Sequence, residues 1–149
     1  FFKQKTAYEI PKRDWSSDVC SSDLDRFKPD IIYTHHYNDL NIDHRLTFEA
    51  AMIACRPLAE SSVKEIYCFE ILSSTGWRGI SNLGFKPNVY VDIKYYIRKK
   101  IDLMKIYEKE IRPSPHPRSV ESITARAISR GSEVSLSYAE SFELIRYIR

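Results

Sequence analysis

Short apolar runs that are typical of buried strands recur along the chain from residue 31 onwards. Residues 31–33, 63–71 and 87–93 are rich in isoleucine, valine and aromatic residues, and proline or polar residues flank each run. We therefore predict a strand in each of them. Residues 138–149 fit a strand and a helix equally well, and the pattern leaves that choice open.

Segments with helical spacing separate these runs. Apolar side chains fall on one face of residues 41–56, residues 94–111 carry apolar positions beside a strongly charged face, and residues 119–131 begin at serine and end at glycine. Asn41 or Asp43 is placed to cap the first of these helices. Strands that alternate with helices predict an α/β domain with a mostly parallel sheet, in which loops at the carboxyl ends of strands carry the chemistry.

The composition is that of one globular domain. The chain has 149 residues, of which 43% are hydrophobic and 29% charged, and its formal net charge is +3. It has no run of about 18 apolar residues and no basic block with interleaved aromatics, so we expect no membrane-spanning segment and no nucleic-acid partner. Three cysteines without a CxxC spacing argue against a disulfide framework. We expect reduced thiols and a cytoplasmic location.

The first 24 residues differ from the rest of the chain because they show neither strand nor helix periodicity. Their stretches KQKTAYEI and DWSSDVCSSDL back-translate into DNA that resembles a common short-read sequencing adapter. We therefore predict that residues 1–24 are a translated artefact, and that residues 25–149 are the C-terminal portion of a domain whose N-terminal strands are truncated. The alternative is a native N-terminus with a poor structural pattern.

Chemically active residue types are concentrated in the stretch IYTHHYNDLNIDHR, residues 32–45, which holds three of the four histidines. His44 falls just inside the start of a predicted helix, so one imidazole nitrogen can face a metal while an acceptor orients the other. Hydrolytic zinc sites use three protein ligands and leave a fourth position for water, and one loop does not easily supply all three. Spacing alone therefore leaves two interpretations open, a metal site and a hydrogen-bonded polar loop.

The order of motifs along the chain carries more information than the spacing does. PDIIYTHHYNDLNIDHR, SST, PNVYVDI, PHPRS, RG and AESF follow one another within residues 26–149, and this series resembles the LmbE-like, or PIG-L, family of zinc-dependent N-deacetylases. The resemblance implies a Rossmann-like three-layer sandwich. It also implies a zinc-dependent hydrolase that removes an N-acetyl group from an N-acetylglucosamine-type amino sugar or glycoside.

The resemblance implies roles for several residues of the histidine-rich loop. His44 matches the last zinc ligand of the family, and Asp43 matches the acidic residue that orients the neighbouring catalytic group. Asn41 occupies a position that is often histidine in the family; its amide can donate a hydrogen bond to an oxyanion but carries no transferable proton. His36 or His35 could supply the acid instead.

One family motif is absent from this sequence. HPDD provides the other two zinc ligands and the general base in the family, and residues 1–149 do not contain it. We expect it in the missing N-terminal part, so that two further zinc ligands come from there. The fragment itself is accordingly expected to be inactive.

Substrate contacts are expected farther along the chain. His116 and Arg118 lie in the stretch PSPHPRS, which in the family approaches the sugar site, and Arg45 and Glu70 are further candidates for contacts with the substrate. A proline-stiffened linker with a solvated arginine is the alternative for that stretch. We expect a small-molecule amino-sugar substrate, and the resemblance leaves a homo-oligomer open.

Two other functions remain open for this sequence. A domain that kept the fold and lost the metal site would be a non-catalytic carbohydrate-binding domain. A domain with an intact site could be a zinc hydrolase of another acyl amide or ester, because zinc and water do not determine the leaving group. An upstream HPDD motif in the gene would favour an enzyme, and substrate assays would separate the two hydrolases.

Overall fold

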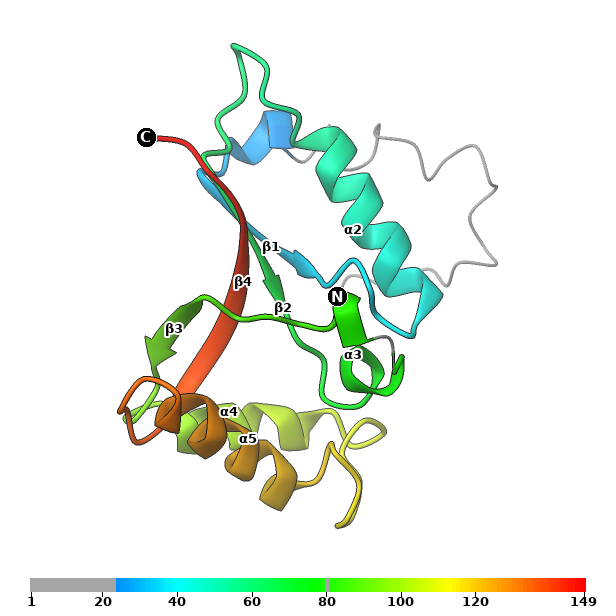
Figure 1. The fold of residues 1–149 in the computed structure, drawn as a ribbon, viewed down its shortest axis with the longest axis vertical. Coiled ribbons are helices and arrows are strands. Elements are labelled where there is room, and N and C mark those ends of the chain that lie inside the picture. Colours follow the sequence, from blue (N-terminus) through cyan, green and yellow to red (C-terminus); the bar gives the residue numbers. More distant parts are fainter. Residues whose placement is uncertain (1–23, 80) are drawn as a thin grey trace.

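The computed structural model describes residues 24–79 and 81–149. Apart from Leu24, the predicted artefact at residues 1–24 lies outside the described residues. Four strands of the described part form one sheet in the order β1-β2-β4-β3 (Figure 1). Their bounds are Ile31–His35 for β1, Glu65–Phe69 for β2, Val89–Asp92 for β3 and Ala139–Tyr147 for β4.

The sheet is mixed, so the prediction of a mostly parallel sheet is wrong. β1 and β2 are parallel, with Ile31 beside Glu65 and His35 beside Phe69. β4 runs antiparallel to both β2 and β3, and its residue Phe142 lies opposite Phe69. The chain enters β4 at the end where β2 finishes, and therefore runs back along β2. Residues 138–149, which the sequence pattern left undecided, supply this central strand, and the predicted α/β class is confirmed.

Helices follow the strands largely where the periodicity predicts them. The first predicted helix begins after Asn41, one of its two predicted caps, whose side chain accepts a hydrogen bond from the Asp43 backbone amide at 2.9 Å. The segment 94–111 contains a shorter helix than predicted, because residues 94–96 form a turn before it and the helix ends at Ile106. The helices are α2 (Ile42–Ala54), α3 (Ser74–Trp77), α4 (Ile97–Ile106) and α5 (Val120–Ser132), with a 3-10 turn at Ser81–Leu83.

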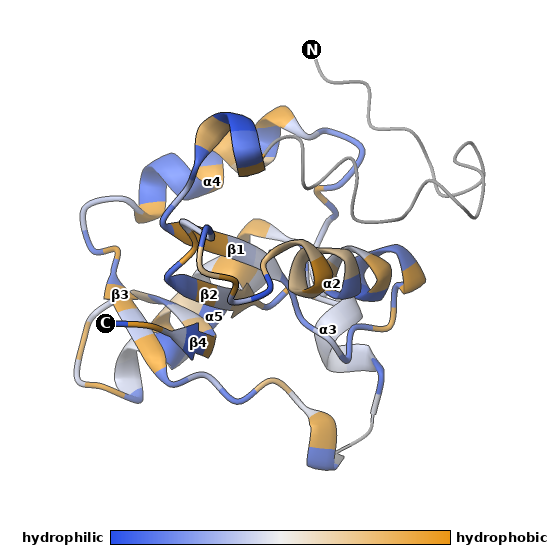
Figure 2. Ribbon diagram, turned by 90° about the horizontal axis from the view of Figure 1, so that it is seen from above, coloured by the Kyte–Doolittle hydropathy of each residue, from blue (hydrophilic) through white to orange (hydrophobic). Residues whose placement is uncertain are grey.

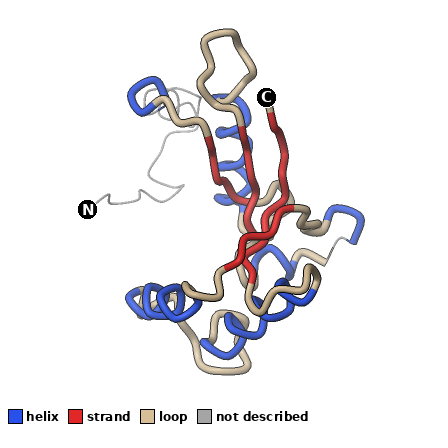
Figure 3. Tube along the Cα trace, turned by 90° about the vertical axis from the view of Figure 1, so that its left-hand side faces the viewer, coloured by secondary structure: helices blue, strands red, loops and turns tan. Residues whose placement is uncertain are grey.

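The helices lie at two ends of the sheet. α2 packs beside β1, whereas α4 and α5 lie together near β3 and the start of β4 (Figures 1 and 3). One apolar core contains Cys55, Val63 and Ile66. A second contains the buried residues Ile93, Ile97 and Ala127 and joins α4 to α5.

The amphipathic character predicted for residues 94–111 is visible in α4, which carries both hydrophilic and hydrophobic residues (Figure 2). Its Ile97 is buried, while Lys99 is exposed. Among the helices that the structure describes, none has the length and apolar character needed to cross a lipid bilayer.

Candidate active site

The loop between β1 and α2 begins at His36 and ends at Asn41, at the carboxyl end of a strand. Successive side chains of a strand point to opposite faces of the sheet, so His35 and His36 diverge although they are neighbours in the sequence. The loop turns sharply after them, with the Asp39 amide donating to the His36 carbonyl at 3.2 Å. This turn brings the Asp39 carboxylate to the start of α2, where it accepts a hydrogen bond from the backbone amide of Asn41.

Asp39 is fully buried and its carboxylate collects hydrogen bonds from two segments. One carboxylate oxygen accepts from the backbone amide of Asn41 at 2.8 Å. The other accepts from the hydroxyls of Ser74 at 3.0 Å and Thr75 at 2.6 Å. Burial alone would raise the pKa of Asp39, but the hydrogen bonds from Thr75, the Asn41 amide and Ser74 outweigh it and hold the pKa below its usual value. Asp39 is therefore an ionised carboxylate inside the protein.

Two arginines hold the backbone of the same residue. The Asp39 carbonyl accepts hydrogen bonds from Nη1 of Arg45 at 2.7 Å and from Nη1 of Arg78 at 3.0 Å. Arg45 also donates to the Leu40 carbonyl at 2.9 Å. The predicted substrate residue Arg45 is thus occupied with the loop itself, and the loop is fixed at both its carboxylate and its main chain.

His44 in the first turn of α2 faces this carboxylate. Its Nδ1 lies 3.1 Å from Oδ1 of Asp39, and its side chain is 21% exposed. The contact favours the tautomer with the proton on Nδ1, which makes Nε2 the nitrogen that carries the lone pair. Nε2 lies 3.4 Å from the amide nitrogen of Asn41, whose oxygen is engaged as the helix cap. The structure therefore brings together His44, Asn41 and the buried Asp39.

His35 forms a wall of this group. Its ring stacks on that of His44 with 4.2 Å between centroids, and the tilted ring of Phe69 lies with its centroid 5.0 Å from that of His35. Burial lowers the pKa of His35 to about 4, helped by His44 and opposed by Asp39. Its buried Nδ1 has no hydrogen-bond partner within the described part of the chain. His35 is thus a neutral ring next to the candidate ligand.

His36, the predicted acid, lies on the other face of the sheet. It is fully buried, its Nδ1 accepts from the Asn38 amide at 3.2 Å, and its Nε2 lies 3.3 Å from Glu143 of β4, within ion-pair distance but poorly aligned for a hydrogen bond. Burial lowers the pKa of His36 and outweighs the opposite effect of Glu143. Its ring contacts Tyr37 and Phe85 rather than His44.

Asp43, which we expected to orient a neighbouring catalytic group, contacts Asn41 only through its backbone in the hydrogen bonds of the described structure. The Asp43 amide donates to the Asn41 side chain, and its carbonyl accepts from Thr47. The carboxylate that faces His44 belongs to Asp39, which our sequence analysis did not single out. The available signal was the spacing of Asp39 and Asn41, because an aspartate often accepts from the amide two residues later.

Comparison with known proteins supports the fold. No family model matches the sequence. Three solved structures match most of this chain. They are the 4-carboxy-2-hydroxymuconate hydratase GalB from Pseudomonas putida KT2440 (17% identity, TM-score 0.69, 97% of this chain and 63% of that one), N,N'-diacetylchitobiose deacetylase from Pyrococcus horikoshii (18%, 0.68, 96% and 55%) and the pseudoaglycone deacetylase of the antimicrobial reagent A40926 (18%, 0.64, 96% and 62%).

The chain has the LmbE-like fold. The resemblance predicted from the motifs is confirmed at the level of the fold, which is what such identities establish. The chain spans only 55–63% of the length of these three structures.

Within this LmbE-like fold, the described residues fit one part of a zinc site. His44 offers an imidazole nitrogen whose partner nitrogen faces a buried carboxylate, as is usual for histidine ligands. A catalytic zinc needs three protein ligands. Residues 24–79 and 81–149 contain no group of three histidine, cysteine, aspartate or glutamate side chains placed to hold a metal. Among the described residues, His44 with its supporting carboxylate is thus a candidate for one zinc ligand.

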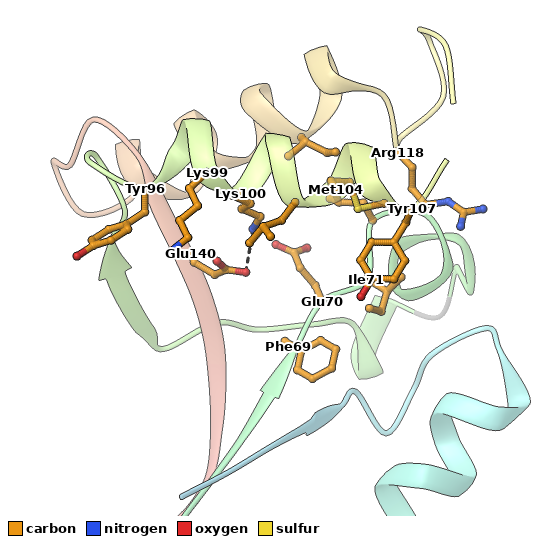
Figure 4. A pocket seen from close by; sticks show the side chains of 13 residues that line it. Phe69, Glu70, Ile71, Tyr96, Lys99, Lys100, Met104, Tyr107, Arg118 and Glu140 are labelled. Atoms are coloured by element: carbon orange, nitrogen blue, oxygen red, sulfur yellow. Dashed lines mark hydrogen bonds and ion pairs between the residues drawn. The ribbon is translucent and has the colours of Figure 1, made fainter. Parts of the chain in front are cut away.

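A cavity of about 600 Å³ opens beside this end of the LmbE-like sheet. Phe69 and Glu70 enter it from the end of β2, and Glu70 extends toward α4 (Figure 4). Arg118 lines the cavity and forms an ion pair with Glu110. Since Phe69 also packs on His35, the cavity begins two rings away from His44.

The four predicted substrate residues therefore fall into two groups. Glu70 and Arg118 line the cavity, and Glu70 also forms a two-bonded ion pair with Arg130 of α5, at 2.8 and 3.1 Å. Arg45 and His116 have internal partners instead. His116 packs edge-on against Trp77 at 5.7 Å and accepts a hydrogen bond from the Arg118 amide.

Proposed function

We propose that this chain is part of a zinc-dependent hydrolase that removes an N-acetyl group from an N-acetylglucosamine-type amino sugar or glycoside in the cytoplasm. The observation that carries the proposal is the pairing of Nδ1 of His44 with buried Asp39, which leaves Nε2 available as a ligand. The fold gives further support, because two of the matching structures are deacetylases of a diacetylated disaccharide and of a pseudoaglycone.

In this proposal Asp39 and His44 act as one unit. Asp39 fixes the ring orientation of His44 and increases the basicity of its free nitrogen. Three donors, the hydroxyls of Ser74 and Thr75 and the Asn41 amide, keep Asp39 ionised and immobile. The remaining zinc ligands and the general base would come from outside the described residues, together with further strands that complete a three-layer sandwich. Bound zinc would polarise the acetyl carbonyl and bring the pKa of a water from about 15.7 to near 7.

Asn41 has the geometry of an oxyanion donor in this site. Its side-chain oxygen caps α2, so the NH₂ group is turned toward Nε2 of His44, 3.4 Å away. An acyl oxygen that approaches a group held at Nε2 would therefore meet an amide donor. Such a donor stabilises the charge that develops on the carbonyl oxygen without transferring a proton.

Of the two loop histidines predicted as the acid that protonates the leaving amine, we propose His35, because it is the one beside His44. His36 and His35 were the candidates in the loop, and both have a lowered pKa caused mainly by burial. His35 borders His44 directly, whereas His36 contacts Glu143. Comparison of pH–rate profiles for His35→Ala and His36→Ala would separate these roles, because only loss of the acid removes the alkaline limb.

Acetate release tests the proposed function. The protein, extended by whatever the natural gene encodes upstream, is incubated with N-acetylglucosamine glycosides in zinc-supplemented and metal-depleted buffer. We expect zinc-dependent release of acetate and a free amine, and loss of both in His44→Ala. Glu49→Ala is the control, because it changes an exposed residue of the same helix.

Zinc content, measured separately, distinguishes the remaining possibilities. Stoichiometric zinc that depends on His44, without acetate release, would favour a hydrolase of another acyl amide or ester. Absence of both zinc and acetate release, with retained sugar binding, would contradict the enzyme and favour a carbohydrate-binding domain. Because one matching structure is a hydratase, acetate itself must be measured rather than substrate loss.

A further inference from the structure

A second cavity, of about 370 Å³, lies between α3, the segment that precedes β3, and α5. Its lining is unusually rich in arginine. Arg78, Arg126 and Arg130 line it together with one carboxylate, Glu70, which leaves a formal excess of two positive charges, 3 − 1 = +2. Such a concentration of guanidinium groups in a concave site favours an anion.

The three arginines differ in how firmly they are held. Arg130 is fixed by its two bonds to Glu70 and one to Glu133, and its guanidinium lies 5.5 Å from the centre of the Phe85 ring. Arg78 donates through Nη1 to the Asp39 carbonyl, while its Nε is a buried donor without a partner in the described structure. Arg126 is exposed.

The cavity is connected to the candidate active site through two residues, Thr75 and Arg78. Thr75 lines the cavity, and its hydroxyl donates to Oδ2 of Asp39 at 2.6 Å, while Oδ1 of Asp39 faces His44. Arg78 makes a second connection, because it lines the same cavity and holds the Asp39 carbonyl. A ligand in this cavity would therefore contact the residues that support the histidine-rich loop.

We propose that this arginine cavity binds an oxyanion group of the ligand, a carboxylate or a phosphate. Its volume is within the range of small-molecule sites. Arg78 offers an unpartnered donor and Arg126 an exposed guanidinium, whereas Arg130, bound to Glu70 and Glu133, adds a fixed positive charge at the wall. Where the ligand is the amino-sugar substrate, this inference rests on the proposed function and narrows the substrate to acidic amino sugars.

Calorimetric titration of the metal-free full chain tests this site. The probes are inorganic phosphate, N-acetylglucosamine 6-phosphate, N-acetylmuramate and, as the neutral reference, N-acetylglucosamine. We expect tighter binding of at least one anionic sugar than of the neutral sugar, and Arg126→Gln should weaken it about tenfold, as expected for loss of one charged hydrogen-bond donor. The matched control is Arg98→Gln, which makes the same charge change on the exposed side of α4 and should leave the affinity within about twofold.

The outcomes are distinguishable from those of the acetate assay. Preference for the phosphorylated or the carboxylated sugar identifies the source of the oxyanion. Equal binding of neutral and anionic sugars, or equal losses in Arg126→Gln and Arg98→Gln, would overturn the arginine site. Anion binding without acetate release would support the cavity and contradict the deacetylase, whereas release from neutral sugars alone would do the reverse.

Discussion

Two histidine–carboxylate pairs occur around one loop, and they differ in what they leave available. Nε2 of His36 lies 3.3 Å from Glu143, and Nδ1 of His44 lies 3.1 Å from Asp39. His36 is fully buried, whereas His44 is 21% exposed beside a fully buried carboxylate. In the first pair the imidazole is enclosed; in the second the carboxylate is enclosed and the imidazole reaches the surface.

The nitrogen atoms show the consequence of this difference. His36 uses one nitrogen as acceptor for the Asn38 amide and directs the other at Glu143, so neither is offered to a ligand. His44 directs Nδ1 at Asp39, and its Nε2 lies 3.4 Å from the side-chain amide nitrogen of Asn41. Because both nitrogens of buried His36 face internal groups, this histidine acts as a structural tie between the β1–α2 loop and β4. His44 is a candidate for chemistry, because one nitrogen is oriented by a buried carboxylate and the other has only a long contact with Asn41 on a partly exposed side chain.

Activity should separate the two pairs most strongly. In the acetate assay, His44→Ala should lose at least about a thousandfold in kcat/KM, as expected for removal of a residue at the reacting centre. His36→Gln should retain activity within about tenfold, because it removes a tie on the other face of the sheet. Equal losses in the two variants at equal folded fractions would contradict the assignment.

Asp39 should give the largest effect on stability. Asp39→Ala leaves Ser74, Thr75 and the Asn41 amide without their acceptor, so we expect the free energy of unfolding to fall by about 3–5 kcal/mol in urea titrations. Asp43→Ala is the control, because the hydrogen bonds of Asp43 in the described structure run through its backbone. It should cost about 1 kcal/mol or less, mainly through lost interaction with the helix dipole.

Glu143 should give a smaller loss of stability. Its carboxylate accepts from the Tyr37 hydroxyl at 3.3 Å and the Lys86 amide at 3.0 Å, besides facing His36. Glu143→Gln keeps the shape and one acceptor, so a loss of about 1–2 kcal/mol is expected. Glu140→Gln on the same strand breaks only a partly exposed pair with Lys100 and should cost less than about 1 kcal/mol. A larger loss in Glu140→Gln than in Glu143→Gln would contradict a role for Glu143 in holding the β1–α2 loop on β4.

The sequence predicted the local elements of the fold and one member of each histidine–carboxylate pair, but not the long-range contacts. Strands β1, β2 and β3 and helix α2 were predicted because periodicity, proline boundaries and the Asn41 cap are local signals. The direction of β4 depends on where the chain returns to the sheet, which no local pattern contains. His44 was predicted through motif resemblance. The role of Asp39 was missed because its hydroxyl donors Ser74 and Thr75 lie on a distant segment.

Acid should lower the free energy of unfolding through the His36–Glu143 pair by a small and measurable amount. Burial lowers the pKa of His36 in the folded protein, against about 6.5 in the unfolded chain. Below about pH 6.5 the unfolded chain therefore binds a proton that the folded protein does not, so the free energy of unfolding decreases as the pH falls toward the folded pKa. His36→Gln removes this uptake and should make the decrease shallower, by at most about 1.4 kcal/mol per pH unit.

His35 provides the matched comparison for this pH effect. Its folded pKa of about 4 also lies below that of the unfolded chain, so His35→Gln should flatten the same acid limb down to about pH 4. Urea titrations between about pH 4 and about pH 7.5 would measure both slopes. Parallel curves for His36→Gln and the unmodified chain would mean that His36 takes up its proton without unfolding. In that case Glu143 stabilises a charged imidazole, and His36 changes its protonation state within the folded protein.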